Sequence, residues 1–415
     1  MRDDDTILIV GTTADYIEWI ECRSRTNALF LTAQRERERA VGKFHTPEHE
    51  ILVDLNRPDL CLQLLQDYLR SAQTDLAGIA CFDDESLPLA ALLANELALE
   101  FPSEDAIRQC LDKHVSKQVW HAHGVPCPNA QSISCHSTER DLETLSFPCV
   151  LKPHSGSGSE RVFLCHTPEQ VHEAMLKITA TTKGIGDRVT AVAETFIAGT
   201  EFSCDFSITD GNVQILRTAR KYLASGAPLG TALAYILPAQ LSPRMVDTVL
   251  PDILARAADA MGISRAICMV DFIITDDNDV VLLELSPRMG GDCLPHILLE
   301  GWGIDTISAT VEFARGTPIT PWLKESAPTV VGLRVFAPAP GMVAGIDTHT
   351  IDSDPRLLSH NLHACLGRTV VLPPEDYSSW LLGHVIFQPY LAEDLEDQIL
   401  ELRESLCLHL EEVTV

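Results

Sequence analysis

Two carboxylates on a predicted β-hairpin are the residues of this chain best placed to do chemistry. Apolar runs on both sides of the turn-forming residues 276–279 are typical of a hairpin. With these four residues as the loop, Thr275 faces Val280. The same register places Asp271 directly opposite Glu284, with Cβ atoms about 4.5–5.5 Å apart on one face. Such carboxylates repel each other by roughly 3 kcal/mol at an effective dielectric near 20.

A divalent cation would turn this repulsion into attraction. Oxygen ligands alone, on strands rich in Val, Leu, Ile and Phe, suit Mg²⁺ or Mn²⁺, with phosphate oxygens in the remaining positions. The alternative is a salt-bridged or solvated acidic pair at the end of a sheet.

The residues after Glu284 favour an anion site beside the cation. Ser286 and Arg288 follow on the same face. Gly290 and Gly291 then precede Asp292, which is the expected N-cap of a helix, where backbone N–H groups converge on an anion. The alternative for Arg288 is a structural ion pair with one of the acids.

A lysine and a flexible loop predict a second anion contact. Lys152 ends the strand 147–152, just before a Gly/Ser loop with Gly156, Ser157 and Gly158. Backbone N–H groups of such a loop can cover phosphates that the lysine reaches. The loop lacks the GK[ST] of a Walker A motif, and most Gly/Ser loops are only turns.

One long helix is predicted to come before this strand. It runs from about Ser103, a plausible N-cap, to His123, and Gly124-Val125-Pro126 ends it. Lys113 and Lys117 lie on it four residues apart. Lysines with this spacing are more often solvated surface residues.

A strand that ends at Glu194 has apolar residues just beyond it, Phe196 and Ile197. A backbone edge beside them could hold an adenine. Glu201, which begins a strictly alternating strand, could accept hydrogen bonds from ribose hydroxyls.

The elements that position these residues divide the chain into four parts. Residues 1–110 alternate buried strands and helices, as an α/β unit does. Residues 111–188 contain the lysine-bearing helix and a small α+β unit, and residues 189–318 are rich in strands. A proline-rich connector separates these from a β-containing part at 328–415.

Composition excludes several classes of partner. A formal net charge of −28 over 415 residues leaves no electrostatic footprint for nucleic acid or an anionic membrane. No apolar stretch reaches 18 residues, and none of the 13 cysteines forms a CxxC motif. We expect a cytoplasmic protein with free, mostly buried thiols.

In order and spacing, these motifs resemble those of the ATP-grasp superfamily over roughly residues 105–315. The motifs are Asp112-Lys113, Gly124-Val125-Pro126, Val150-Leu151-Lys152-Pro153 with its loop, Glu194 to Glu201, and Asp271 with Glu284 to Arg288. The resemblance implies an α/β and α+β ATP-grasp fold. It would have an N-terminal α/β domain, a small lid domain, a larger β-rich domain and a C-terminal subdomain, with ATP between lid and large domain.

By position, the resemblance also implies a role for each site residue: Lys113 and Lys152 on ATP phosphates, Glu194 and Ile197 at adenine, Glu201 on ribose, Asp271 and Glu284 on Mg²⁺, and Arg288 on an acyl-phosphate. The family usually has asparagine where this chain has Ser286, which leaves the coordination of a second metal open.

Within the superfamily, residues 288–292 and the segments 340–346 and 383–386 look most similar to L-amino-acid ligases and related carboxylate–amine ligases. This implies ATP-dependent formation of an amide or peptide bond through an acyl-phosphate, from a small carboxylate and an amine such as amino acids, with release of ADP and phosphate. The alternatives are a carboxylase that acts through carboxyphosphate and a catalytically inactive ATP-binding sensor. The sequence leaves the oligomeric state open, with a homodimer possible.

Overall fold

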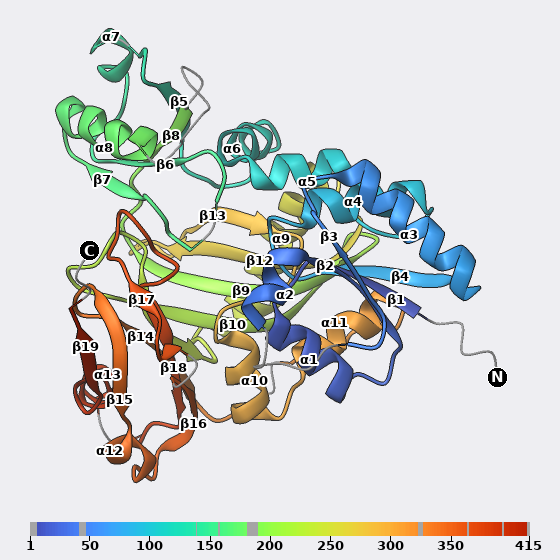
Figure 1. The fold of residues 1–415 in the computed structure, drawn as a ribbon. Coiled ribbons are helices and arrows are strands. Elements are labelled where there is room, and N and C mark those ends of the chain that lie inside the picture. The colour runs from blue at the N-terminus through green and yellow to red at the C-terminus, as the bar shows by residue number, and fades with distance from the viewer. Residues whose placement is uncertain are drawn as a thin grey trace.

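The computed structural model describes residues 6–40, 47–137, 139–156, 158–180, 190–322, 327–362, 365–391 and 394–412. Its N-terminal part is the predicted α/β unit, drawn blue in Figure 1. Four parallel strands in the order β3-β2-β1-β4 are connected by helices, and β1 is buried along its whole length. The elements are β1 (Thr6–Val10), α1 (Ala14–Arg23), β2 (Ala28–Ala33), α2 (Gln34–Ala40), β3 (Glu50–Val53), α3 (Pro58–Ala72), β4 (Leu76–Cys81) and α4 (Leu87–Glu96).

The single helix predicted from Ser103 to His123 is wrong, because two helices occupy this segment. α5 (Glu104–Leu111) begins at the predicted N-cap Ser103, whose side chain accepts from the Ala106 amide. The chain is extended at Asp112, and its carboxylate caps α6 (Lys113–Ala122) by accepting from the amides of His114 and Val115. The break turns the first residue of α6, Lys113, toward the Gly/Ser loop.

The lid is a small α+β layer, drawn green at the upper left of Figure 1. Its antiparallel sheet has the strand order β5-β8-β6-β7, and α8 packs on β6 and β7 around a core of its own. The elements are β5 (Ala130–Ser134), α7 (Glu139–Leu142), β6 (Cys149–Pro153), β7 (Phe163–Cys165), α8 (Pro168–Ala180) and β8 (Thr190–Thr195).

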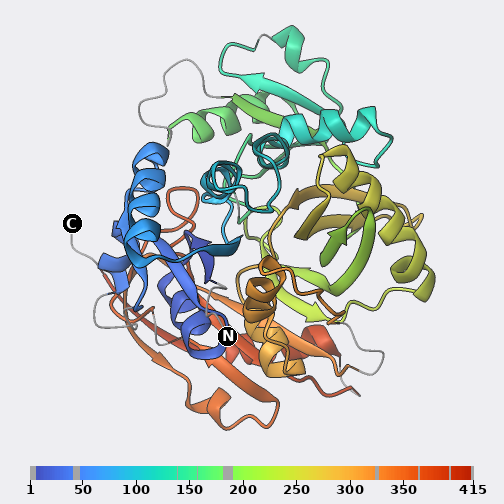
Figure 2. The same ribbon diagram turned by 90° about the vertical axis from the view of Figure 1, so that its right-hand side faces the viewer.

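An eight-stranded sheet forms the centre of the molecule, in the order β13-β12-β9-β10-β11-β14-β18-β16 (Figures 1 and 2). Its last three strands come from the predicted C-terminal part, which therefore continues the central sheet. The elements up to residue 314 are β9 (Thr200–Thr209), β10 (Asn212–Leu223), β11 (Ala232–Leu237), the π-helix η2 (Met245–Val249), α9 (Leu250–Ala260), β12 (Arg265–Ile274), β13 (Val280–Ser286), α10 (Leu294–Trp302) and α11 (Thr306–Ala314).

The C-terminal segment completes this sheet and adds a three-stranded one in the order β17-β15-β19. Its elements are β14 (Val330–Phe336), β15 (Gly341–Asp347), α12 (His349–Asp352), β16 (Leu357–Asn361), β17 (Thr369–Val370), β18 (Leu381–Phe387), α13 (Leu395–Glu404) and β19 (Cys407–Glu411). Among the helices of the described residues, none has the length and apolarity needed to cross a bilayer.

The hairpin of β12 and β13 differs from the prediction at its tip. Val280 pairs with Ile274, not with Thr275. Thr275 belongs to the turn, where its amide donates to the Asp279 carbonyl. A bulge between Asp271 and Phe272 then shifts the pairing by one residue. Asp271 therefore lies opposite Glu284, as predicted.

A group of histidines where β18 meets α10 makes the fold sensitive to acid. His384 is 9% exposed, and its ring lies 4.8 Å from that of His296. Burial, reinforced by His296 and by His360 on β16, lowers the pKa of His384 to about 3. An unfolded histidine has a pKa near 6.5, so the unfolded chain binds the extra proton between about pH 6.5 and 3, and stability falls as pH falls through this window.

We expect His384→Asn to remove part of this acid sensitivity. From pH 7.5 to 5.0, the wild type should lose about 2 kcal/mol of unfolding free energy through this group, which the variant would not lose. Urea unfolding at both pH values measures the difference, with the exposed His172→Asn on α8 as the control. Equal pH dependence of wild type and His384→Asn would contradict the assignment.

Candidate active site

A cavity of about 240 Å³ lies between the lid and the central sheet, and it collects the predicted nucleotide residues. Its apolar part includes Val150 on β6, Ile273 on β12 and Leu283 on β13. Every predicted nucleotide residue that the structure describes lines it: Lys113, Lys152, Gly156, Gly158, Glu194, Phe196, Ile197 and Glu201. Ser157 lies outside the described residues.

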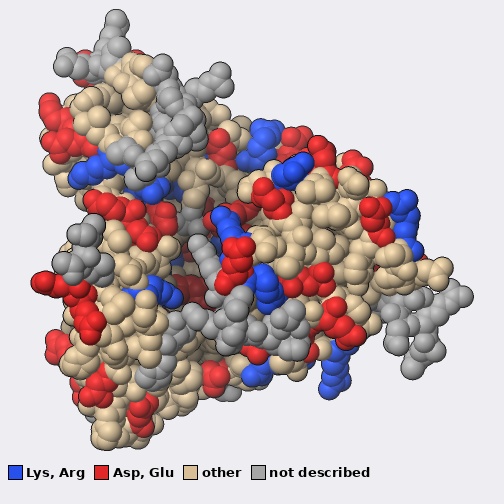
Figure 3. All heavy atoms as spheres, in the orientation of Figure 1, with Lys and Arg blue, Asp and Glu red and all other residues tan. Residues whose placement is uncertain are grey.

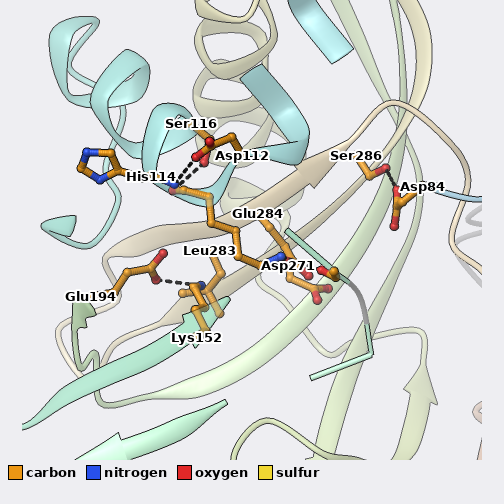
Figure 4. Close-up of polar contacts among 12 residues, drawn as sticks. Asp84, Asp112, His114, Ser116, Lys152, Glu194, Asp271, Leu283, Glu284 and Ser286 are labelled. Atoms are coloured by element: carbon orange, nitrogen blue, oxygen red, sulfur yellow. Dashed lines mark hydrogen bonds and ion pairs between the residues drawn. The ribbon is translucent and has the colours of Figure 1, made fainter. Parts of the chain in front are cut away.

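Glu194 is buried at one end of this cavity between two lysines. Its carboxylate lies 2.8 Å from Lys152 Nζ and 3.5 Å from Lys117 Nζ. Burial alone would raise the pKa of Glu194, but the two ammonium groups lower it, so the carboxylate stays ionised. Figure 4 shows Glu194 and Lys152 pointing toward each other.

The expectation that Lys117 is a solvated surface residue is wrong. Its side chain is fully buried, and its ammonium donates to the Leu283 carbonyl. Spacing along α6 could not show this, because the partners come from β8 and β13.

Lys113 connects the Gly/Ser loop to the acidic hairpin. Its Nζ lies 2.6 Å from the Gly156 carbonyl oxygen and 3.6 Å from a Glu284 oxygen. The backbone amide of Lys113 donates to the His154 carbonyl at 2.9 Å, which fixes the start of α6 against the loop. This ammonium therefore lies between the loop and the hairpin, where the phosphates of a bound nucleotide would lie.

The paired acids have the donor set of a hard cation site. Asp271 is 7% exposed, and its Oδ1 is buried without a hydrogen-bond partner. A cation would satisfy that oxygen. Among the described residues no group of three or more His, Cys, Asp or Glu could hold a metal. The two carboxylates of Asp271 and Glu284 are a donor set that fits Mg²⁺ or Mn²⁺ when the ion also binds phosphate oxygens.

The surroundings shift the pKa values of Asp271 and Glu284 in opposite directions. Burial raises the pKa of Asp271, and the negative charges of Glu284 and Glu201 add to this against the effect of Lys221. Burial also acts on Glu284, but the surrounding lysines, Lys113 first, lower its pKa. Glu284 is thus the firmly ionised member of the pair.

Lys221 on β10 is a site residue that we did not predict. Its Nζ lies 2.5 Å from Asp271 and 2.6 Å from Glu201. The ammonium therefore fixes the predicted ribose ligand and one predicted metal ligand at once. The sequence does not single this lysine out, because Arg217 and Arg220 lie on the same strand, and its partners depend on how β9, β10 and β12 pair.

Arg288 is paired with a residue of the N-terminal sheet, Asp84, in the loop after β4. Both oxygens of Asp84 accept from the guanidinium, with Arg288 Nε at 2.8 Å from Oδ1. The Ser286 hydroxyl donates to the same carboxylate (Figure 4). The predicted alternative of an ion pair for Arg288 is therefore present, although its partner is neither Asp271 nor Glu284. Ser286 is directed at Asp84 and not at the acidic pair.

The neighbouring Asp83 holds the Asp84 loop in place. Its carboxylate accepts from the Thr12 amide at 2.8 Å and from the Ser86 amide at 2.7 Å. Gly11 packs against this loop, where a Cβ would lie 2.0 Å from the Ser86 hydroxyl.

The glycines after Arg288 are arranged differently from the prediction. The Gly290 amide donates to the buried Asp205 at 3.0 Å, so it is not free for a substrate anion. Asp292 is not an N-cap: α10 is preceded by Cys293, and Asp292 has φ +58° and pairs with Arg334 at 2.7 Å. Gly291 does line a cavity, together with Arg288 and Arg334.

This second cavity, of about 380 Å³, adjoins the first. The two share Lys113, Gly156, Gly158, Ser159, Gly230, Asp271 and Glu284. Four cations line the second cavity, namely Lys113, Lys221, Arg288 and Arg334, and each is paired with a carboxylate. The outer surface is different, because acidic side chains are spread widely over the face shown in Figure 3.

Comparisons with known proteins agree with the fold. Residues 145–296 match the family model of the ATP-grasp domain. The chain is 25% identical over 339 residues to carnosine synthase 1 of Homo sapiens, which covers 76% of this chain and 40% of that protein. The chain therefore spans about two fifths of the length of this relative.

Two solved structures resemble almost the whole chain. The L-amino acid ligase from Bacillus licheniformis superposes with a TM-score of 0.79 and 19% identity, covering 99% of this chain and all of the ligase. The carboxyaminoimidazole ribonucleotide synthase of Aspergillus clavatus, complexed with ATP, gives a TM-score of 0.72 with 15% identity, covering 97% of this chain and 99% of that one. At these identities the likeness concerns the fold alone.

Proposed function

We propose that this chain is an ATP-dependent carboxylate–amine ligase of the ATP-grasp type. The fold over nearly its full length and the match of the ATP-grasp domain model to residues 145–296 support this. It joins a small carboxylic acid, such as an amino acid, to an amine, and releases ADP and phosphate. ATP binds in the 240 Å³ cavity and the two small substrates bind in the 380 Å³ cavity.

One observation carries the proposal: the two cavities meet at Asp271, Glu284 and Lys113. The γ-phosphate of a nucleotide in the first cavity would reach this junction, where a carboxylate in the second cavity can attack it. The paired acids would hold Mg²⁺ there, which neutralises phosphate charge and orients the phosphate oxygens.

The chain's own residues supply positioning and charge. Lys113, Lys152 and Lys221 surround the transferred phosphoryl group, and Arg288 lies beyond Glu284 where the first substrate's carboxylate binds. A carboxylate oxygen attacks the γ-phosphorus and ADP leaves. The amine then attacks the acyl carbon, and phosphate leaves with the C–O electron pair. Preorganised cations at developing charge are the main source of rate in such reactions.

The lid contributes by excluding water. Its loop residues Gly156 and Gly158 border both cavities, so the loop covers the junction where the acyl-phosphate forms. An activated acyl group that met water there would be hydrolysed, and the ATP would be spent without product.

We expect amide formation that is matched to ADP release. Pairs of amino acids and small acids are incubated with Mg²⁺ and ATP, ADP is assayed, and mass spectrometry detects a product lighter than its precursors by one water. Phosphate release should require a carboxylate substrate. If bicarbonate supports ADP release while no amine yields an amide, the carboxylase replaces the ligase. If no combination releases ADP although ATP binds, the protein is a sensor.

A further inference from the structure

The bulge in β13 determines whether the two acids face each other. At the hairpin tip, Ile274 pairs with Val280. Continued without a bulge, this register would place Asp271 opposite Leu283. Glu284 would then lie opposite Val270, whose side chain is in the core on the other face of the sheet. The extra residue, Leu283, is therefore what brings Glu284 onto the face of Asp271.

Two contacts from the α6 segment meet β13 at this bulge. β13 is the edge strand of the central sheet, so its outer backbone groups need partners from elsewhere. The Leu282 amide donates to the Pro126 carbonyl at 2.9 Å. The Leu283 carbonyl, on the bulged residue itself, accepts from the Lys117 ammonium. Figure 4 shows Leu283 beside Glu284, on the side of Lys152 and Glu194.

Lys117 is an unusual residue in this position. Its side chain has no exposed surface, and its Nζ lies 5.1 Å from the centre of the Trp120 ring and 3.5 Å from Glu194. Burying an ammonium costs several kcal/mol unless it is paired and hydrogen-bonded. The Leu283 carbonyl and Glu194 together provide that compensation, and Lys152 occupies the other oxygen of Glu194.

We propose that Lys117 is a positioning residue for the cation site. It holds the Leu283 bulge, and through it the register of Glu284 with Asp271, without touching nucleotide or metal itself; it lines neither cavity. This inference rests on the proposed function, because it assigns the paired acids to a metal–nucleotide complex. It also links the lid to the hairpin, since Glu194 on β8 contacts the same ammonium.

The proposal predicts a selective loss of metal affinity in Lys117→Met, which keeps the length of the side chain and removes the donor and the charge. Residues that orient metal ligands typically change metal affinity by about 10–100-fold when replaced. Electron paramagnetic resonance of free Mn²⁺, titrated in the presence of saturating ADP, should show at least about tenfold weaker Mn²⁺ binding. ADP binding without metal, measured by calorimetry, should change by less than about twofold.

The matched control is Lys177→Met, which removes an exposed lysine from α8 in the lid and should bind Mn²⁺ as the wild type does. If Lys117→Met does not fold, Lys117→Gln, which keeps an N–H donor, is measured instead and should show a smaller loss.

Three outcomes would overturn the proposal. Lys117→Met could bind Mn²⁺ like the wild type. ADP binding without metal could fall as much as Mn²⁺ binding, which would make Lys117 a nucleotide contact. Both variants could unfold, which would assign the lysine to the fold alone. A wild-type protein that binds neither ADP nor Mn²⁺–ADP would refute the proposed function itself, a result distinct from these three.

Discussion

Replacing Glu284 by alanine is expected to reduce amide formation by at least about a thousandfold. In the proposed cation site this carboxylate is one of two protein ligands, and the charge neutralisation lost with it would be worth several kcal/mol in the transition state. At 1.36 kcal/mol for each factor of ten, this corresponds to about three orders of magnitude. Initial rates of ADP release at saturating ATP and Mg²⁺ measure the effect.

The fold should survive this change. The Glu284 side chain is 39% exposed, so alanine there leaves no core cavity, and the unfolding midpoint should move by only a few degrees. Asp277→Ala, on the exposed loop of the same hairpin, is the control and should keep full activity. A Glu284→Ala protein with near-normal turnover would remove the cation site from the mechanism.

Lys221→Met is expected to lower activity by about tenfold or more at pH 7, with recovery as the pH rises. Lys221 opposes the effect of burial on Asp271, so its loss raises the pKa of that carboxyl further. A protonated Asp271 cannot hold a cation, and it ionises only as pH rises through its elevated pKa. Burial and its neighbours place the pKa of Asp271 at about 6 in the wild type. A rise to about 8 in the variant would leave roughly a tenth of the carboxyl ionised at pH 7, so ionisation alone would account for about a tenfold loss.

The pH–rate profile from pH 6 to 10 distinguishes this cause from a general loss of structure. The rising limb of the Lys221→Met profile should lie at higher pH than that of the wild-type profile. Removal of one partner from a buried ion pair also costs about 3–5 kcal/mol of stability, so assays are run well below the unfolding midpoint. Arg220→Met is the control: its side chain is 44% exposed and pairs with Glu396 at 3.5 Å, away from the site. An unshifted profile would contradict the role assigned to Lys221.

The acidic hairpin shows what the sequence could and could not predict. The predicted pairing of Asp271 with Glu284 is confirmed. The predicted loop at 276–279, which would pair Thr275 with Val280, is wrong, because Ile274 pairs with Val280. At the tip, the observed pairing differs from the predicted register by one residue. The bulge at Leu283 restores the predicted register at Asp271 and Glu284. The bulge is contacted by Lys117 and Pro126, more than 150 residues earlier, so no local pattern could reveal it.

The same limit explains the missed residues. The ATP-grasp resemblance could be predicted from the sequence because its motifs are local, and the match of the ATP-grasp domain model to residues 145–296 confirms it. The partner of Arg288 is a loop residue of another sheet, Asp84, and the partners of Lys221 depend on strand order, so both required the tertiary structure. The helix break at Asp112 is different: an aspartate before a lysine-rich helix is a recognisable N-cap, and the signal was present in the sequence.

The continuity of the central sheet has a mechanical consequence. Backbone hydrogen bonds join β13, which carries Glu284, through six intervening strands to β16, and β14 with Arg334 lies among them. Glu284 and Arg334, which both line the second cavity, are thus parts of one continuous sheet, whereas the lid has a sheet of its own. A movement of the lid would therefore change the distances between the lid and the central sheet and leave those within the sheet unchanged. Energy transfer between one fluorophore on the lid and one on the central sheet would then change during turnover. Energy transfer between two fluorophores on the central sheet would stay constant.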